Sequence, residues 1–103
     1  MSLSPRPTAV LTSNDLMAIG ALQAASHAGL RIPEDISIIG FDDVPIASMV
    51  VPKLTTIQLP RREIAAYAFS GLLQATRDGV VANSETVHPR LIVRKSTGPV
   101  RHS

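Results

Sequence analysis

The segment from Ile32 to Asp43 constrains the fold more than any other stretch, because a nearly continuous apolar run there ends in two carboxylates. Its sequence is IPEDISIIGFDD. Unbroken branched and aromatic side chains are typical of a strand covered on both faces, as in a parallel sheet. Ligands of open α/β sheets bind beyond the carboxyl ends of strands, so Asp42 and Asp43 are candidate contacts for a polar small molecule.

A strand-helix-strand unit is expected around this segment. Thr8 to Thr12 predicts a short buried strand, and Asp15 to Ala28 predicts a helix that Gly29 ends in a left-handed conformation. Small apolar residues recur at helical spacing and predict the face that packs on the sheet: Met17, Ala21, Ala24, Ala25 and Ala28. The fold class is therefore α/β with a parallel sheet.

The second half of the chain predicts a strand, a long helix and a final strand. Leu54 to Leu59 is rich in β-branched residues, and Pro60 opens a helix that runs to about Asp78 before Gly79. A loop follows, and Leu91 to Ser96 alternates into the last strand. The helix carries an apolar stripe that must be buried: Ile64, Ala65, Ala68, Phe69, Leu72 and Leu73.

Composition excludes several classes of protein. A chain of 103 residues forms one domain at most, and 45% hydrophobic against 17% charged residues is ordinary for a packed protein. The absence of cysteine excludes disulfides and thiolate zinc sites, and it fits a reducing compartment such as the cytoplasm. No apolar run is long enough to span a membrane, no secretion signal is visible, and residues 1–6 look like a cloning remnant or linker.

The charge distribution argues against nucleic-acid binding by this chain itself. Up to Leu59 there are 3 basic and 5 acidic residues, and from Pro60 onward 7 basic and 3 acidic ones, so the halves carry −2 and +4. The positive surplus is diffuse, and only 3% of residues are aromatic, which leaves no platform for stacking bases.

Two kinds of role are open for the polar residues at the strand ends. Asp42 is favoured as a ligand contact, because a carboxylate accepts two hydroxyl hydrogen bonds at once. Asp43 either contacts a ligand or caps a helical turn at Val44 to Val50. Asn14 either caps the first helix or faces a ligand, and both roles are met if Asp15 caps and Asn14 faces the crevice.

Catalytic and metal sites are not indicated. No phosphate-binding loop accompanies the acidic pair, and Lys53 and Lys95 are not placed to complete a magnesium site. The histidines His27, His88 and His102 lack metal-ligand spacing and are expected at the surface. No serine lies in a nucleophile elbow, so neither an enzyme nor a cofactor is expected.

Four segments in order carry a family resemblance: PTAVLTSNDLMAIGAL from Pro7, GLRIPEDISIIGFDD from Gly29, PKLTTI from Pro52 and LIVRKST from Leu91. With them the chain resembles the C-terminal part of a lactose-repressor (LacI/GalR) family transcription regulator. The resemblance implies a periplasmic-binding-protein-like (type I) effector core. It assigns residues 7–59 to the second lobe, 60–79 to a crossover helix of the first lobe, and 80–103 to a loop, return strand and tail.

The resemblance also implies a function. Asn14 and Asp42 match effector-contacting positions. Near Leu59 to Arg61, where the chain crosses the cleft, the sequence departs from the family, whose members often carry Gln or an aromatic residue there, and Arg61 is a further candidate contact. The effector is a small molecule, with a sugar favoured. Operator DNA is bound only through a headpiece absent from this chain. A homodimer contact matches an outward helix face and an apolar loop: Ile19, Leu22, Gln23, Ile46, Met49, Val50 and Val51.

Other functions are compatible with this sequence. The same fold serves periplasmic sugar-binding transport receptors, and a small magnesium enzyme is the least favoured third candidate. The long helix would lack the sheet on which its stripe packs in the intact family. We therefore expect the chain to oligomerise, to exchange this helix with a neighbour, or to fold it back onto its own sheet.

Overall fold

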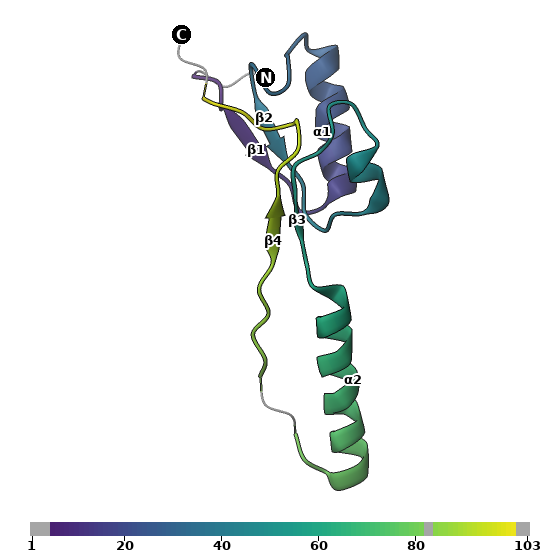
Figure 1. The fold of residues 1–103 in the computed structure, drawn as a ribbon. Coiled ribbons are helices and arrows are strands. Elements are labelled where there is room, and N and C mark those ends of the chain that lie inside the picture. Colours follow the sequence, from purple (N-terminus) through teal and green to yellow (C-terminus); the bar gives the residue numbers. More distant parts are fainter. Residues whose placement is uncertain (1–4, 82–83, 101–103) are drawn as a thin grey trace. The chain divides into compact units, whose positions relative to one another are not determined.

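The computed structural model describes residues 5–81 and 84–100, and these residues form short strands and two α-helices (Figure 1). The chain divides into a first unit, Met1–Gln58 with Arg90–Ser103, and a second unit, Leu59–Pro89. The elements in chain order are β1 (Ala9–Leu11), α1 (Asp15–His27), β2 (Ser37–Ile39), the 3-10 helix η1 (Pro45–Ser48), β3 (Thr56–Gln58), α2 (Arg61–Asp78) and β4 (Arg90–Ile92).

The strands of the first unit confirm the predicted α/β class. β1 pairs with β2 in parallel, with Val10 opposite Ile38, and α1 connects them. Beyond β2, Ile39 forms a parallel bridge with Thr55, while β3 pairs with β4 antiparallel. Each strand is shorter than its predicted segment, because the flanking residues leave the regular ladder.

The segment that follows β4 packs along β2, although β4 ends at Ile92 and not at the predicted Ser96. The amide of Ile38 donates to the Ser96 carbonyl over 2.9 Å. The buried Ser96 hydroxyl donates to the Ile38 carbonyl at 2.6 Å and accepts from the Thr55 amide at 2.8 Å. One buried serine therefore joins the segment after β4 to β2 and to the residue before β3.

The core of the first unit lies between α1, the strands and η1, and its buried hydrophobic residues are Ala18, Leu22, Ala25, Ile36, Ile38, Ala47 and Leu54. The predicted packing face of α1 was right at Ala25 and at Ala21, which packs against the core, and wrong at its other positions. Ala18, Leu22 and Ala25 are buried, whereas Met17, Ala24 and Ala28 are exposed. Nearly every position of α1 is small or apolar, so spacing alone could not select the row.

Glycines end both helices as predicted. Gly29, just beyond α1, has φ 77°, and Gly79, the C-cap of α2, has φ 68°. In this left-handed region a β-carbon would be strained. Pro60 is the residue before α2 and not its first helical residue.

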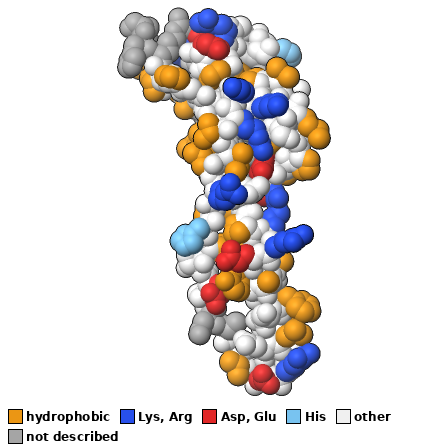
Figure 2. Space-filling model, in the orientation of Figure 1, with side chains coloured by type: hydrophobic (Ala, Val, Ile, Leu, Met, Phe, Trp, Pro, Cys, Tyr) orange, Lys and Arg blue, Asp and Glu red, His pale blue; other side chains and the backbone are white. Residues whose placement is uncertain are grey.

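α2, described over its whole length, has no buried residue. Its apolar stripe is largely open to solvent, with Phe69 62% and Leu72 60% exposed. Figure 2 shows hydrophobic side chains at the surface over the segment that Figure 1 labels α2. The expectation that oligomerisation, exchange or folding back covers this stripe stays a prediction.

Candidate functional site

Asn14 is the N-cap of α1, and its side-chain oxygen accepts a hydrogen bond from the Met17 amide at 2.8 Å. The division of roles in which Asp15 caps and Asn14 faces the crevice is therefore wrong. Asn14 has the extended backbone of a cap, with φ −158°, so its side chain reaches the free amides of the first turn. The cap uses only the oxygen of the side-chain amide.

Asp42 and Asp43 form a turn in which two consecutive non-glycine residues have positive φ, 118° and 56°. Such conformations cost on the order of 1 to 3 kcal/mol each and persist where surrounding contacts hold them. The amide of Asp42 donates to the Ile57 carbonyl at 2.7 Å, which ties the turn to β3. Strained backbone of this kind is common at ligand-binding sites.

Asp43 is held by an ion pair and an amide. Its Oδ1 accepts from Arg94 Nη2 at 2.8 Å, and its Oδ2 accepts from Gln58 Nε2 at 2.9 Å. Both members of the ion pair are largely shielded from solvent. η1 has Val44 at its N-cap and no side-chain cap, so the prediction that Asp43 caps this turn was wrong. The Asp43 carboxylate binds Arg94 and does not cap η1.

Asp15 is buried at the start of α1, with 1% of its surface exposed. Its Oδ1 accepts from the Thr56 hydroxyl at 2.6 Å and its Oδ2 from the Val44 amide at 2.8 Å. A β-carbon on Gly40 would collide with Oδ1 of Asp15 and come 2.9 Å from Cδ2 of Leu54. Glycine at position 40 therefore leaves the space in which this carboxylate sits.

The structure places Asn14 and Asp42 beyond the ends of paired strands. Leu11 and Ile39 are opposite each other in the parallel register, and Asn14 and Asp42 each follow three residues later. The Thr12 amide and hydroxyl both donate to the Ile39 carbonyl at 3.0 Å, which joins the two strand ends. Arg61 belongs to the second unit, where it is the exposed first residue of α2.

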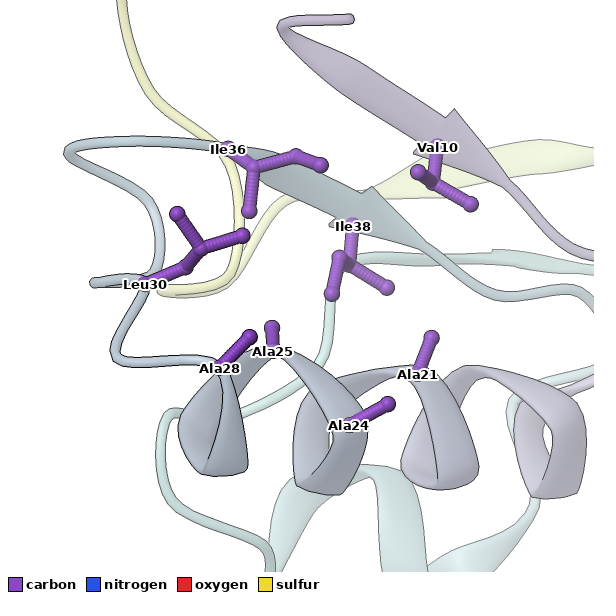
Figure 3. Close-up of a pocket in the computed structure, with 8 residues that line it drawn as sticks. All are labelled: Val10, Ala21, Ala24, Ala25, Ala28, Leu30, Ile36 and Ile38. Carbon is purple, nitrogen blue, oxygen red and sulfur yellow. The ribbon is translucent and has the colours of Figure 1, made fainter. Parts of the chain in front are cut away.

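An apolar hollow of about 290 Å³ lies between α1 and the strands of the first unit. Figure 3 shows alanines of α1 on one side of it and Val10, Ile36 and Ile38 on the other. The alanine row predicted to pack tightly on the sheet lines this open space instead: Ala21, Ala24, Ala25 and Ala28. Its lining offers no polar side chain, and neither Asn14 nor Asp42 borders it.

The residues predicted for the dimer contact divide into two groups. Met49 and Val51 are 71% and 93% exposed, and Ile46 is exposed as well. Leu22 is buried in the core, so its placement on an outward face of α1 was wrong. It does border a shallow hollow of about 360 Å³ with Gln23, Ser26, His27 and Val51. Ile19 and Val50 are half-buried.

Sequence reasoning missed the residues that hold the Asp42 turn. Asp15 was considered only as a cap, Thr56 as a strand former, and Arg94 as part of a diffuse basic surplus. Gln58 carried no signal, because an amide in a strand is ordinary. The one signal in the sequence that pointed to these contacts was Arg94, which follows the apolar residues at the start of the last strand segment. A charged side chain that becomes buried there needs a partner of opposite charge.

The described residues contain no group of three or more His, Asp or Glu side chains that could hold a metal ion. Within the same residues, neither helix has the length and apolar character that crossing a membrane requires. His27 and His88 are exposed as predicted, whereas His102 lies outside the described residues.

Residues 1–97 match the model of the periplasmic binding protein-like domain. The chain belongs to this family. This periplasmic binding protein-like domain is of the type found in LacI-type regulators.

Several of its relatives are named as transcriptional repressors or LacI family regulators. The chain is 45% identical to the HTH-type transcriptional repressor PurR of Salmonella arizonae over 98% of its own length and 30% of the relative's. A LacI family regulator from Arthrobacter sp. FB24, solved in complex with lactose, is 37% identical, with a TM-score of 0.77. The match covers 91% of this chain and 37% of the regulator. A dimeric Lac repressor is 38% identical, with a TM-score of 0.78, and the match covers 88% of this chain and 34% of the repressor. The chain thus spans about a third of the length of these proteins.

Proposed function

We propose that the chain is the effector-sensing and dimerising part of a DNA-binding transcriptional regulator, with a sugar or related small molecule as effector. The observation that carries the proposal is the turn at Asp42, which has left-handed backbone and is tied to β3 beyond the end of a parallel strand. Asn14 follows the neighbouring strand end. A carboxylate and an amide at adjacent strand ends suit a ligand bearing several hydroxyl groups.

The relatives support this reading at two points. The Arthrobacter regulator was solved with lactose, a sugar that bears several hydroxyl groups. The Salmonella relative is named as an HTH-type repressor, so DNA binding in the intact regulator would come from a headpiece outside this chain. Effector binding would then favour one arrangement of the core and shift the population that binds DNA. The role is non-catalytic, and a cytoplasmic location goes with it.

Thermal shift on the full natural gene product that carries this sequence tests effector binding. The panel is lactose, sucrose and the common nucleobases, and we expect at least one compound to raise the melting temperature. Asp42→Ala should abolish that rise, because it removes the acceptor of two hydroxyl hydrogen bonds. Asp78→Ala, at the far end of α2, is the control and should respond like the wild type. A full response by Asp42→Ala removes this residue from the site.

The proposed dimer contact is the apolar loop with Ile46, Met49 and Val51. These exposed hydrophobic residues form a cluster that a second subunit would cover, and the Lac repressor relative is a dimer. Covering such side chains contributes about 1.5 to 3 kcal/mol each. We expect the half-exposed Val50 and Ile19 to lie at the rim of the contact, and Gln23 to offer it a polar group.

Sedimentation equilibrium of Val51→Glu tests the contact. The substitution places a charge in the middle of the apolar loop, so the dimer dissociation constant should rise at least tenfold. Val93→Glu, at an exposed valine outside the loop, should leave it unchanged. Equal weakening by both variants would point to general surface effects and not to this contact.

A periplasmic sugar-binding transport receptor remains the alternative with the same fold. The matching curated relatives are repressors, which favours the regulator. The sequence upstream in the natural gene discriminates the two: a helix-turn-helix there supports the regulator, and a signal peptide supports the receptor.

A further inference from the structure

We propose that Asp15 is a positioning residue of the effector site, which holds the Asp42 turn in its ligand-binding conformation without touching the ligand. The proposal rests on the proposed function of Asp42 and adds to it the group that fixes its backbone. Asp15 stands next to the cap residue Asn14, so one carboxylate joins the start of α1 to the turn that follows β2.

Asp15 reaches the turn by two routes. Directly, its Oδ2 accepts from the amide of Val44, the residue that follows Asp43. Indirectly, its Oδ1 accepts from the Thr56 hydroxyl at 2.6 Å, and this hydroxyl oxygen in turn accepts from the Asp43 amide at 3.4 Å. The two amides that follow Asp42 thus both depend on Asp15.

The turn needs such support, because Asp42 and Asp43 both have positive φ. Neither is glycine, so relaxation to ordinary backbone is favourable unless contacts prevent it. The Asp43 side chain is fixed separately by Arg94 and Gln58, and the Asp42 amide by the Ile57 carbonyl. Asp15 is then the group that fixes the amides of Asp43 and Val44.

Burial explains why this contact is specific. Asp15 is 1% exposed, and Thr56 is fully buried. A buried carboxylate that loses a donor has no water to replace it, so the geometry of its donors is tightly set. Gly40 is part of the same arrangement, because any side chain there would displace the carboxylate.

Asp35 provides a matched control that distinguishes a positioning role of Asp15 from a general contribution to stability. Asp35 is also a buried aspartate, and its Oδ2 accepts from the Arg31 amide at 2.8 Å. It precedes β2, at the opposite end from the Asp42 turn, and its hydrogen bond and charge raise the pKa of Arg31 above its ordinary value. Asp35→Asn therefore perturbs a buried carboxylate whose hydrogen bonds to Arg31 lie at the other end of β2 from the turn.

The experiment compares Asp15→Asn with Asp35→Asn in the full natural gene product. Amide hydrogen exchange is followed at Asp42 and Val44, with the Ile38 amide of β2 as the internal reference. Affinity is measured by titration calorimetry with whichever of lactose, sucrose or the nucleobases stabilises the wild type most. We expect Asp15→Asn to speed exchange at both Asp42 and Val44 at least tenfold relative to Ile38, and to weaken binding at least tenfold. Asp35→Asn should do neither.

Thr56→Val and Thr56→Ser provide a second pair, which serves if Asp15→Asn does not fold. Valine removes the hydroxyl and should speed exchange at Asp42, whereas serine retains it and should restore wild-type exchange.

Faster exchange at Val44 alone, with Asp42 unchanged, overturns the positioning role and leaves a local contact. Wild-type affinity of Asp15→Asn also overturns it, provided that Asp42→Ala has lost binding. If Asp42→Ala binds like the wild type, the proposed effector contact fails instead, and the exchange data alone decide whether Asp15 holds the turn.

Discussion

The first unit buries its apolar residues, whereas α2 exposes its own. Ile38 and Leu54 are almost fully inaccessible, while Phe69 and Leu72 on α2 are more than half exposed. Both regions follow periodic apolar patterns in the sequence. The difference shows that periodicity establishes a helix and its apolar face, but burial requires a second surface, and the described residues provide one only for the first unit.

The largest expected effect contrasts the two regions directly. Ile38→Ala should lower the free energy of unfolding by about 2 to 5 kcal/mol, because it leaves a cavity in the core. Leu72→Ala, measured by urea denaturation at a concentration where the chain is monomeric, should change it by less than about 0.5 kcal/mol. A loss at Leu72 comparable to that at Ile38 would show that α2 is covered in the monomer.

The second prediction concerns what covers α2 at higher concentration. Phe69→Glu should raise the dissociation constant of self-association at least tenfold, because a covered aromatic side chain contributes about 1.5 to 3 kcal/mol. Analytical ultracentrifugation measures it. Gln74→Glu adds the same charge at a polar position of α2 and should leave association unchanged. A wild-type chain that stays monomeric at all concentrations would contradict self-association.

A smaller effect is expected at the ion pair of Arg94 and Asp43 within the first unit. Arg94→Ala removes the partner of Asp43 and should lower the free energy of unfolding by about 1.5 kcal/mol, since hydrogen bonds to charged groups are worth roughly this much. Lys95→Ala, the exposed neighbour, is the control. Equal stability of Arg94→Ala and the wild type in urea denaturation would show that the ion pair contributes nothing net.

The smallest expected effect is a change in the pKa of Tyr67 on α2. Tyr67 donates to Glu63 Oε1 at 3.2 Å, and this hydrogen bond together with the carboxylate charge raises the pKa of Tyr67 above the ordinary value. Tyr67 is the only tyrosine, so absorbance of the tyrosinate reports it alone. Glu63→Gln removes the charge, so the pKa should fall towards the ordinary value. An unchanged titration midpoint would indicate that the hydrogen bond does not form.

The elements could be predicted from the sequence because local signals fix them. The β-branched run at Ile36 to Ile39 gave β2, and Gly29 and Gly79 gave the helix ends. The parallel pairing of β1 and β2 followed from the length of the intervening helix.

The contacts at the site could not be predicted, because they join residues far apart in the chain. Asp15 meets Thr56 across 41 positions and Asp43 meets Arg94 across 51. Nothing local distinguishes a carboxylate that caps its own helix from one that bonds a distant hydroxyl. Part of the buried row of α1 was missed for a related reason, since a helix apolar on several sides has no single preferred face.

The antiparallel pairing of β3 with β4 has a practical consequence for engineering. Gln58 and Arg90 are partners in register, so the chain leaves and re-enters the first unit at adjacent points. A short hairpin turn could close that gap in place of residues 59–89. The same junction would accept a fluorescent protein whose emission reports on the Asp42 turn, because the Gln58 side chain donates to Asp43 Oδ2 at 2.9 Å.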